Sequence, residues 1–330
     1  MTLSPPVQAF VDATPNEALD FLTIAEQRQF MRHTSDLLYL RFGQRREPVA
    51  AVTDYQVAVD GGRIRVRAYR PNNESPLPAH VFLHGGAWWL GSIDEYVNDA
   101  LCRYRCEHAR CVVLAVGYRL APEHKFPTAI NDVRAALQWI VQQADLLGID
   151  PNVISIGGAS AGANLAAATA LACRDLAGPA LAFQLLEVPA LDLTLAHARR
   201  GFEAVELAPL GIDPSILDLA VHYYLADPAQ ALSELASPIR AAELSGLPPA
   251  HVITAELDPL RGEGEHYAAL LATAGVRVTT RRYLDAIHAT SFLTRIWPTA
   301  RAWQHDAASI LRQAHERAAG SEDYRSAMRA

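Results

Sequence analysis

Short apolar runs recur along the chain from about residue 54, and most of them are followed by a stretch of helical character. The runs are YQVAV, RIRVRAY, HVFLHG, CVVLAVGY, VISIGG, ALAFQLLEV, HVITAEL and VRVTTRRYL. The first two alternate in polarity around the tripeptide DGG, which is typical of a β-hairpin. The later runs, apart from VRVTTRRYL, are mostly apolar, as parallel strands are when helices cover both faces of their sheet. The pattern predicts an α/β fold with about eight mostly parallel strands.

Three segments depart from this alternation. Near the N-terminus, Thr14 as N-cap, Pro15 and Glu17 form a capping-box pattern that predicts a helix running, with one break, to about Arg41. We therefore expect residues 1–45 to form a helical segment separate from the domain at 46–316. A mainly helical insertion is expected at about 195–237, and residues 317–330 read as a polar tail.

The composition narrows the class of protein. The 330 residues are half hydrophobic, which suffices for one large core, and the net charge of −7 comes without a basic patch that would indicate nucleic acid. No apolar run reaches the ~18 residues of a membrane span, and the N-terminus lacks signal-peptide features. We expect a soluble, cytoplasmic protein. The scattered histidines and the four cysteines predict no metal site and no disulfide, the cysteines being Cys102, Cys106, Cys111 and Cys173.

One serine stands between an apolar strand and an Ala-rich helix, in the sequence Gly158-Ala159-Ser160-Ala161-Gly162. This matches G-x-S-x-G, in which flanking glycines leave room for a serine on a strained turn. The motif alone is weak, because the same glycines could serve close packing of a helix on a strand. A nucleophilic serine also needs a base, and the base needs a group that orients it.

Both partners follow in the chain. Asp258 comes just after the run HVITAEL, and His288 comes just after the next strand. The order serine, acid, histidine at successive strand ends predicts the triad Ser160, Asp258 and His288. Glu187 and Asp192 are the rival acids, since they end the strand after the serine. The role of Glu187 stays open here, because a carboxylate in an apolar run is costly unless it is paired.

An acyl-transfer site also needs donors for the oxyanion of the tetrahedral intermediate. The N–H of Ala161 opens a helix, where the helix dipole favours negative charge. Further donors are expected from Gly85, Gly86 and Ala87, which directly follow the strand HVFL and His84. Glycines at this point let the backbone approach a substrate closely.

Four blocks, HGGAW, YRLAPEHKFP, GASAGANLA and DPLRGEGE, resemble those of the hormone-sensitive-lipase-like family of α/β-hydrolase carboxylesterases in order and spacing. The resemblance covers about residues 50–315. It implies an α/β-hydrolase fold, hydrolysis of carboxylic esters without metal or organic cofactor, and a cap formed by residues 1–45 and 195–237. It also implies that Glu123 and His124 belong to a structural turn.

The chain departs from the family pattern at four positions. Ala87 replaces the third oxyanion glycine, and Ala159 stands where many relatives carry Asp or Thr. Gly262 replaces the usual Asp of the acid block, and Ala289 replaces a common Gly after the base. These changes affect loop geometry and substrate fit, while all three triad residues are retained.

The sequence therefore predicts a serine esterase for small esters of short to medium acyl length. The acyl pocket is expected to be lined by Trp88, Leu22, Leu207 and Leu210. An amidase or deacetylase on the same triad is an alternative, and a non-catalytic ligand receptor is disfavoured because His288 is retained. The run VRVTTRRYL is expected at a sheet edge, where its arginines either blunt the edge or flank a homodimer seam.

Overall fold

A single mixed sheet forms the centre of the molecule in the computed structural model, which describes residues 2–15, 22–204, 208–210 and 213–320. Its order is β1-β2-β4-β3-β5-β6-β7-β8, with β2 antiparallel to both neighbours and every other pair parallel. This confirms the predicted α/β fold, its hairpin and the edge position of the last strand. The strands are β1 Ala51–Val59, β2 Gly62–Arg70, β3 Leu77–Leu83, β4 Val112–Gly117, β5 Ile149–Ala159, β6 Phe183–Glu187, β7 Ala250–Leu257 and β8 Val278–Ile287.

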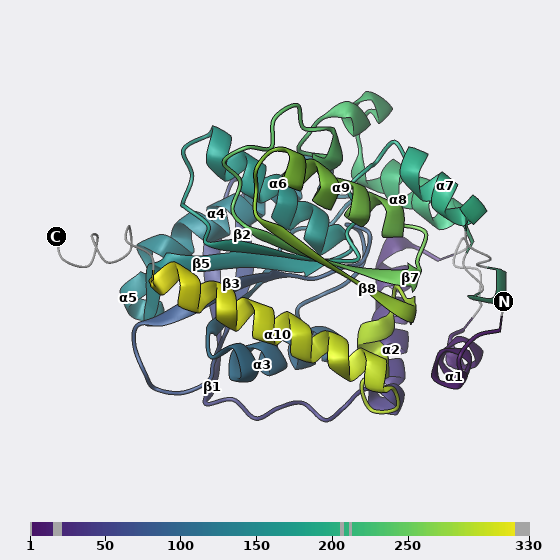
Figure 1. Ribbon diagram of the computed structural model, residues 1–330, viewed down its shortest axis with the longest axis horizontal. Helices are drawn as coiled ribbons and strands as arrows, with labels where there is room; N and C mark the ends of the chain where they lie inside the picture. The colour runs from purple at the N-terminus through teal and green to yellow at the C-terminus, as the bar shows by residue number, and fades with distance from the viewer. Residues whose placement is uncertain (1, 16–21, 205–207, 211–212, 321–330) are drawn as a thin grey trace.

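Helices cover both faces of this sheet (Figure 1). One face carries α3 (Tyr96–Ala109) and α10 (Pro298–Ala319), and the other carries α4 (Thr128–Gln142), α6 (Ala161–Asp175) and α9 (Arg261–Thr273), with the short α5 (Ala144–Leu147) after α4. Alternate strand residues enter different cores. Val81 and Leu83 belong to the core with α4 and α6, whereas Phe82 belongs to the core with α3 and α10. Two buried faces explain the unbroken apolar runs of the sequence.

The N-terminal helices are α1 (Pro5–Ala13) and α2 (Ile24–Phe42), so the predicted helix start at Thr14 is wrong. The N–H of Thr14 donates to the carbonyl of Phe10 at 3.0 Å, which closes α1 instead. The capping box is nine residues later, where the Thr23 hydroxyl accepts from the Glu26 N–H at 3.3 Å and the Glu26 carboxylate accepts from the Thr23 N–H at 2.8 Å. The pattern T-x-x-E occurs twice in this stretch, and Glu17 of the first copy lies outside the described residues.

The described residues of α1 and α2 pack against the main body. Phe10 of α1 and Phe42 of α2 meet edge to face, with ring centroids 5.9 Å apart. Phe10 also contacts Phe292 in the 3₁₀ helix Thr290–Leu293, which begins two residues after His288. These side chains share the core of α3 and α10, so the N-terminal helices stabilise the region around the carboxyl ends of the strands.

The segment predicted as an insertion is mainly helical in the residues that the structure describes. It contains α7 (Ala196–Ala204), α8 (Ser215–Tyr224) and 3₁₀ helices at Ala208–Leu210 and Pro228–Leu232, and a further 3₁₀ helix, Pro238–Arg240, directly follows it. In Figure 1, α7 lies with α1 and α2 at the right, the end to which the arrows of β7 and β8 point. The predicted tail begins later than residue 317, because α10 runs to Ala319.

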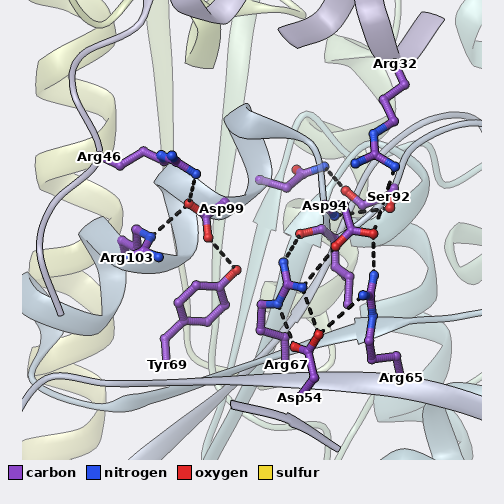
Figure 2. Close-up of polar contacts among 12 residues, drawn as sticks. Arg32, Arg46, Asp54, Arg65, Arg67, Tyr69, Ser92, Asp94, Asp99 and Arg103 are labelled. Atoms are coloured by element: carbon purple, nitrogen blue, oxygen red, sulfur yellow. Dashed lines mark hydrogen bonds and ion pairs between the residues drawn. The ribbon is translucent and has the colours of Figure 1, made fainter. Parts of the chain in front are cut away.

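Ion pairs fasten the β1–β2 hairpin to the segment that leads into α3 (Figure 2). Arg67 binds Asp54 on the hairpin at 2.7 Å and Asp94 at 3.0 Å, and Arg65 also pairs with Asp94. The hydrogen bond from Arg67 lowers the pKa of Asp54 below its usual value. The segment at 92–95 is therefore held by side chains of the hairpin. None of the described helices is long and apolar enough to cross a membrane, and all four cysteines are buried free thiols.

Candidate active site

Ser160 occupies the sharp turn between β5 and α6, with φ 56° and ψ −119°. Positive φ is uncommon for a residue other than glycine and marks a strained, over-determined backbone. The Ser160 N–H donates to the Glu187 carbonyl at 2.9 Å. A Cβ on Gly158 or on Gly162 would lie 2.2 Å or 2.1 Å from the Leu83 carbonyl oxygen. The glycines on both sides of the serine are therefore required by the close approach of β3.

Asp258 and His288 form a hydrogen-bonded pair beyond the ends of β7 and β8. The Asp258 Oδ2 lies 2.8 Å from the His288 Nδ1, and its Oδ1 accepts from the Leu260 N–H at 2.9 Å. Asp258 is 1% exposed, whereas the His288 side chain is 35% exposed. Burial disfavours the imidazolium, but the charge and the hydrogen bond of Asp258 together outweigh it and raise the pKa of His288 above its usual value. The Nε2 atom is left to act as a base.

The sheet brings the predicted triad to one edge. The strands β5, β6, β7 and β8 are consecutive and parallel, so their carboxyl ends lie on the same side. Ser160 follows β5, Asp258 follows β7 and His288 follows β8. Ligands and reacting groups bind at this edge in open α/β sheets.

The loop after β3, residues 84–91, lies against the serine and is strained. A Cβ on Gly85 would be 3.5 Å from the Ser160 Cβ, which places the start of the loop at the nucleophile. Gly86 has φ 119°, and the non-glycine residues Ala87 and Trp88 have φ 52° and 63°. Two successive left-handed residues with side chains need support from their surroundings.

Four backbone amides near the serine are free to bind a ligand. No acceptor among the described residues pairs with the N–H groups of Gly85, Gly86, Ala87 or Ala161. Ala161 begins the long helix α6, so its N–H also carries the positive end of the helix dipole. Unpaired amides beside a nucleophile are the kind of donor that an oxyanion needs.

His84 supports this loop from inside the core. Its ring stacks on Tyr118, with centroids 4.3 Å apart, and the Tyr118 hydroxyl donates to the His84 carbonyl at 2.8 Å. Burial lowers the pKa of His84 to about 4, so the ring is neutral at physiological pH. This histidine therefore fixes the base of the loop.

The residues predicted to line the acyl pocket occupy different environments. Trp88 is buried and stacks on Tyr224 of α8, with ring centroids 4.7 Å apart. Leu22 and Leu210 are partly buried, and Leu207 lies outside the described residues. Trp88 thus joins the loop after β3 to the inserted segment, and the pocket itself stays a prediction.

The structure explains the buried carboxylate of Glu187. Its Oε1 accepts from the Trp303 Nε1 at 2.8 Å, and its Oε2 pairs closely with Arg105. No histidine among the described residues contacts it, so its partners are structural. The periodic pattern of α3 could have signalled Arg105, which lies on the buried face with Cys102 and Cys106.

A second buried carboxylate, with no role suggested by the sequence, lies beside the acid. Glu263, in the DPLRGEGE block, is fully buried and accepts from the Asp192 N–H at 2.9 Å and from the Leu191 N–H. Burial raises the pKa of Glu263 to about 8. Asp192 in turn binds the His197 Nδ1 at 2.7 Å. These contacts hold the segment after β6 against the start of α9.

Comparisons with known proteins agree with this geometry. A family model that describes the α/β-hydrolase fold matches residues 80–292. The chain is 37% identical over 278 residues to the carboxylesterase NlhH of Mycobacterium tuberculosis, covering 81% of this chain and 84% of that protein. It is 35% identical over 294 residues to an arylesterase of Saccharolobus solfataricus, covering 88% and 92%.

A solved structure extends the likeness to the whole fold. The hyperthermophilic esterase from the archaeon Pyrobaculum calidifontis superposes with a TM-score of 0.86 at 38% sequence identity, covering 95% of this chain and 99% of that one. The strained serine, the unpaired amides and the four sequence blocks all lie within residues 80–292, which the family model matches. The chain therefore belongs to the hormone-sensitive-lipase-like family of α/β-hydrolase carboxylesterases.

Proposed function

We propose that the chain hydrolyses carboxylic esters of short to medium acyl length through an acyl-enzyme on Ser160. That it is a carboxylic ester hydrolase follows from its family and relatives. The observation that carries the assignment of the triad is the 2.8 Å contact between Asp258 and His288, at the sheet edge that also holds the strained Ser160.

Each of these groups has a role in the proposed mechanism. His288 Nε2 takes the proton of Ser160 as Oγ attacks the ester carbonyl carbon, and Asp258 holds the imidazole tautomer and stabilises the imidazolium. The amides described above, those of Gly85, Gly86, Ala87 and Ala161, stabilise the oxyanion. The alcohol leaves with the proton from His288, and water then attacks the acyl-enzyme by the same route and releases the acid.

The expected acyl range follows from what lies around the serine. The loop carrying Trp88 packs against Tyr224 of α8, and α2 lies at the same end of the sheet. Together with Leu22, Leu207 and Leu210, these side chains are proposed to form a covered pocket. A covered pocket favours short and medium chains over long ones, because a long chain has no room to extend.

A fluorophosphonate probe tests the nucleophile directly, because attack by an activated serine displaces fluoride and leaves a covalent phosphonyl group. We expect the label on the peptide containing Ser160, and its loss in His288→Ala, as located by mass spectrometry. A label on Ser155 in place of Ser160 would contradict the proposal. A protein that takes no label would be the non-catalytic receptor.

Substrate panels test the range and the leaving group. We expect kcat/KM on p-nitrophenyl esters to peak between C2 and C8 and to fall by C12. Rates that still rise at C12 would contradict the covered pocket. Equal rates on a matched p-nitrophenyl ester and anilide would favour the amidase alternative, because amide leaving groups need stronger protonation.

A homodimer and a cytoplasmic location complete the proposal. Leu284 on the edge strand β8 is 66% exposed, and Arg281 and Arg282 of that strand pair with Asp306 and Glu265. An apolar side chain on an unpaired edge supports pairing with a second copy. Sedimentation velocity of the protein and of Leu284→Arg would test the dimer, which we expect only for the parent. A monomer in both samples would contradict it. The four free thiols support a reducing compartment.

A further inference from the structure

One arginine of α2 reaches across to the loop that carries the candidate oxyanion donors. Arg28 donates from Nε to the Trp89 carbonyl at 2.8 Å and from Nη2 to the Ala121 carbonyl at 2.6 Å. It also forms a two-pronged ion pair with Glu123, with N–O distances of 2.9 Å and 2.6 Å. The side chain is 26% exposed. A guanidinium has five donors in a rigid fork, and four contacts use most of them.

One carbonyl lies in the strained loop, and the other lies in a segment that is hydrogen-bonded to that loop. Trp89 closes the turn of the loop, because its N–H donates to the Gly86 carbonyl at 3.2 Å. Ala121 lies outside the strands, and its N–H donates to the Trp88 carbonyl at 3.0 Å. Arg28 therefore binds both the turn and the segment around Ala121 that is hydrogen-bonded to the turn. Glu123, from the YRLAPE block, holds the guanidinium in place.

The loop needs such support to keep its shape. Ala87 and Trp88 are both left-handed, which costs energy unless neighbouring contacts enforce it. The loop also closes tightly on itself, since a Cβ on Gly86 would lie 2.3 Å from the Leu90 carbonyl oxygen and one on Gly91 would lie 2.2 Å from the Gly85 carbonyl oxygen. A small relaxation of the turn would rotate the amides at its start.

We propose that Arg28 is a positioning residue, which holds the loop at 84–91 so that its amides point at the oxyanion formed on Ser160. The inference rests on the proposed triad and adds a role for the N-terminal helices. In this view α2 contributes to stabilisation of the transition state and does more than cover the pocket. Glu123 acts through Arg28 and has no contact with the reacting atoms.

A neighbouring arginine provides a matched control. Arg32 lies one turn further along α2, and its nearest carboxylate is Asp94 at 4.0 Å (Figure 2). Asp94 is already held by Arg65 and Arg67 of the hairpin. Removing Arg32 therefore takes one positive charge from the same helix without releasing the loop.

The test compares Arg28→Gln, Arg28→Lys and Arg32→Gln for kcat, KM, melting temperature and inhibition by a trifluoromethyl ketone. That inhibitor forms a hemiketal oxyanion on the serine, so its Ki reports the oxyanion donors. Loss of one oxyanion donor lowers kcat by about 10²–10³-fold. In Arg28→Gln the donors are displaced but still present, so we expect kcat to fall by about 10–100-fold. In Arg28→Gln, Ki should rise by the same factor while KM stays within about threefold. Arg28→Lys should recover part of kcat, and Arg32→Gln should match the parent.

Two outcomes would overturn the inference. One is a lowered melting temperature for Arg28→Gln with parental kcat and Ki, which would make Arg28 purely structural. The other is a loss in Arg32→Gln as large as that in Arg28→Gln, which would make the effect one of the positive charge on α2 and not of the loop contacts. If Arg28→Gln does not fold, Arg28→Lys and Glu123→Gln carry the same comparison. Ser160→Ala, measured in parallel, separates this result from the proposed function. An active Ser160→Ala would overturn the triad and with it this inference, whereas an inactive one beside a parental Arg28→Gln would overturn the role of Arg28 alone.

Discussion

Two serines five residues apart on β5 and its turn show how little a serine–histidine hydrogen bond says by itself. Ser155 lies 2.9 Å from the His80 Nδ1 and 2.8 Å from the His315 Nε2. Ser160 makes no side-chain hydrogen bond to any described residue. On contacts alone Ser155 would be the better candidate, and yet the surroundings assign it a structural role.

The difference lies in backbone, burial and charge. Ser155 is fully buried in the middle of a strand, and burial lowers the pKa of His315 to about 4 and that of His80 well below its usual value. No carboxylate contacts either ring among the described residues, so neither is prepared to carry a positive charge. At the strand end, Ser160 has the strained turn, and His288 has a carboxylate partner and an accessible ring. A base suited to neutral pH needs such a partner.

The most direct test of the difference between the two serines is to remove each hydroxyl in turn. We expect Ser160→Ala to lower kcat by about 10⁶, the scale of a lost nucleophile in a triad, with the melting temperature unchanged. Ester hydrolysis followed with a p-nitrophenyl ester gives the rate, and circular dichroism checks the fold. Activity of Ser160→Ala within tenfold of the parent would remove it from the mechanism.

The second largest loss of kcat is expected when the acid of the triad is replaced. Asp258→Asn leaves His288 in the wrong tautomer, which costs about 10⁴ in kcat, or ~5 kcal/mol of barrier. Glu187→Gln should cost only about tenfold, because Glu187 binds Arg105 and Trp303 and touches the nucleophile only through its backbone carbonyl. Both are measured on one ester. The acid is misassigned if Glu187→Gln is the crippled variant and Asp258→Asn is close to parental.

The sequence predicted the parts of this site that depend on strand order and on short motifs. Strand ends on a parallel sheet meet at one edge, so the order of the strands is enough to group Ser160, Asp258 and His288. The two glycines around the serine could be predicted from the motif, because a serine on this strained turn leaves no room for flanking side chains. The expected edge position of the last strand is confirmed as well.

Contacts between distant segments could not be predicted in this way. Arg28 and Glu123 are separated by 95 residues, and nothing in the pattern of α2 distinguishes Arg28 from Arg32. The start of α2 was misplaced because two T-x-x-E sequences compete and only tertiary packing decides between them. Glu187 was recognised as anomalous, but its partners Arg105 and Trp303 come from α3 and α10, which are far apart in the sequence.

The pH dependence of kcat/KM tests the difference between the two histidine environments. Asp258 raises the pKa of His288, and the base must be neutral, so kcat/KM should be lost as pH falls through that raised pKa and should level off above it. The midpoint is expected above the reference of ~6.5, with about a tenfold loss per pH unit below it. A non-ionising ester isolates the enzyme's own titration. A flat profile from pH 5 to 8 would count against a histidine base.

The smallest effect on rate is expected at the buried serine. Ser155→Ala removes the hydroxyl shared by His80 and His315, whose other ring nitrogens, Nε2 and Nδ1, already lack a partner in the described structure. Leaving a buried polar group unsatisfied costs about 1–3 kcal/mol, so urea denaturation should show that loss in the free energy of unfolding. Because the cluster lies away from the strand ends, kcat should stay within about tenfold of the parent.

An exposed contact of the same kind serves as the control for that measurement. Ser309 and His305 lie 3.5 Å apart on the surface of α10, so Ser309→Ala should change neither stability nor rate. If Ser155→Ala were instead to lose a thousandfold in kcat while keeping parental stability, the buried cluster would belong to the catalytic machinery. The distinction between the two serines would then rest on something other than strain, burial and a carboxylate partner, and the assignment of Ser160 would have to be rebuilt from the labelling result alone.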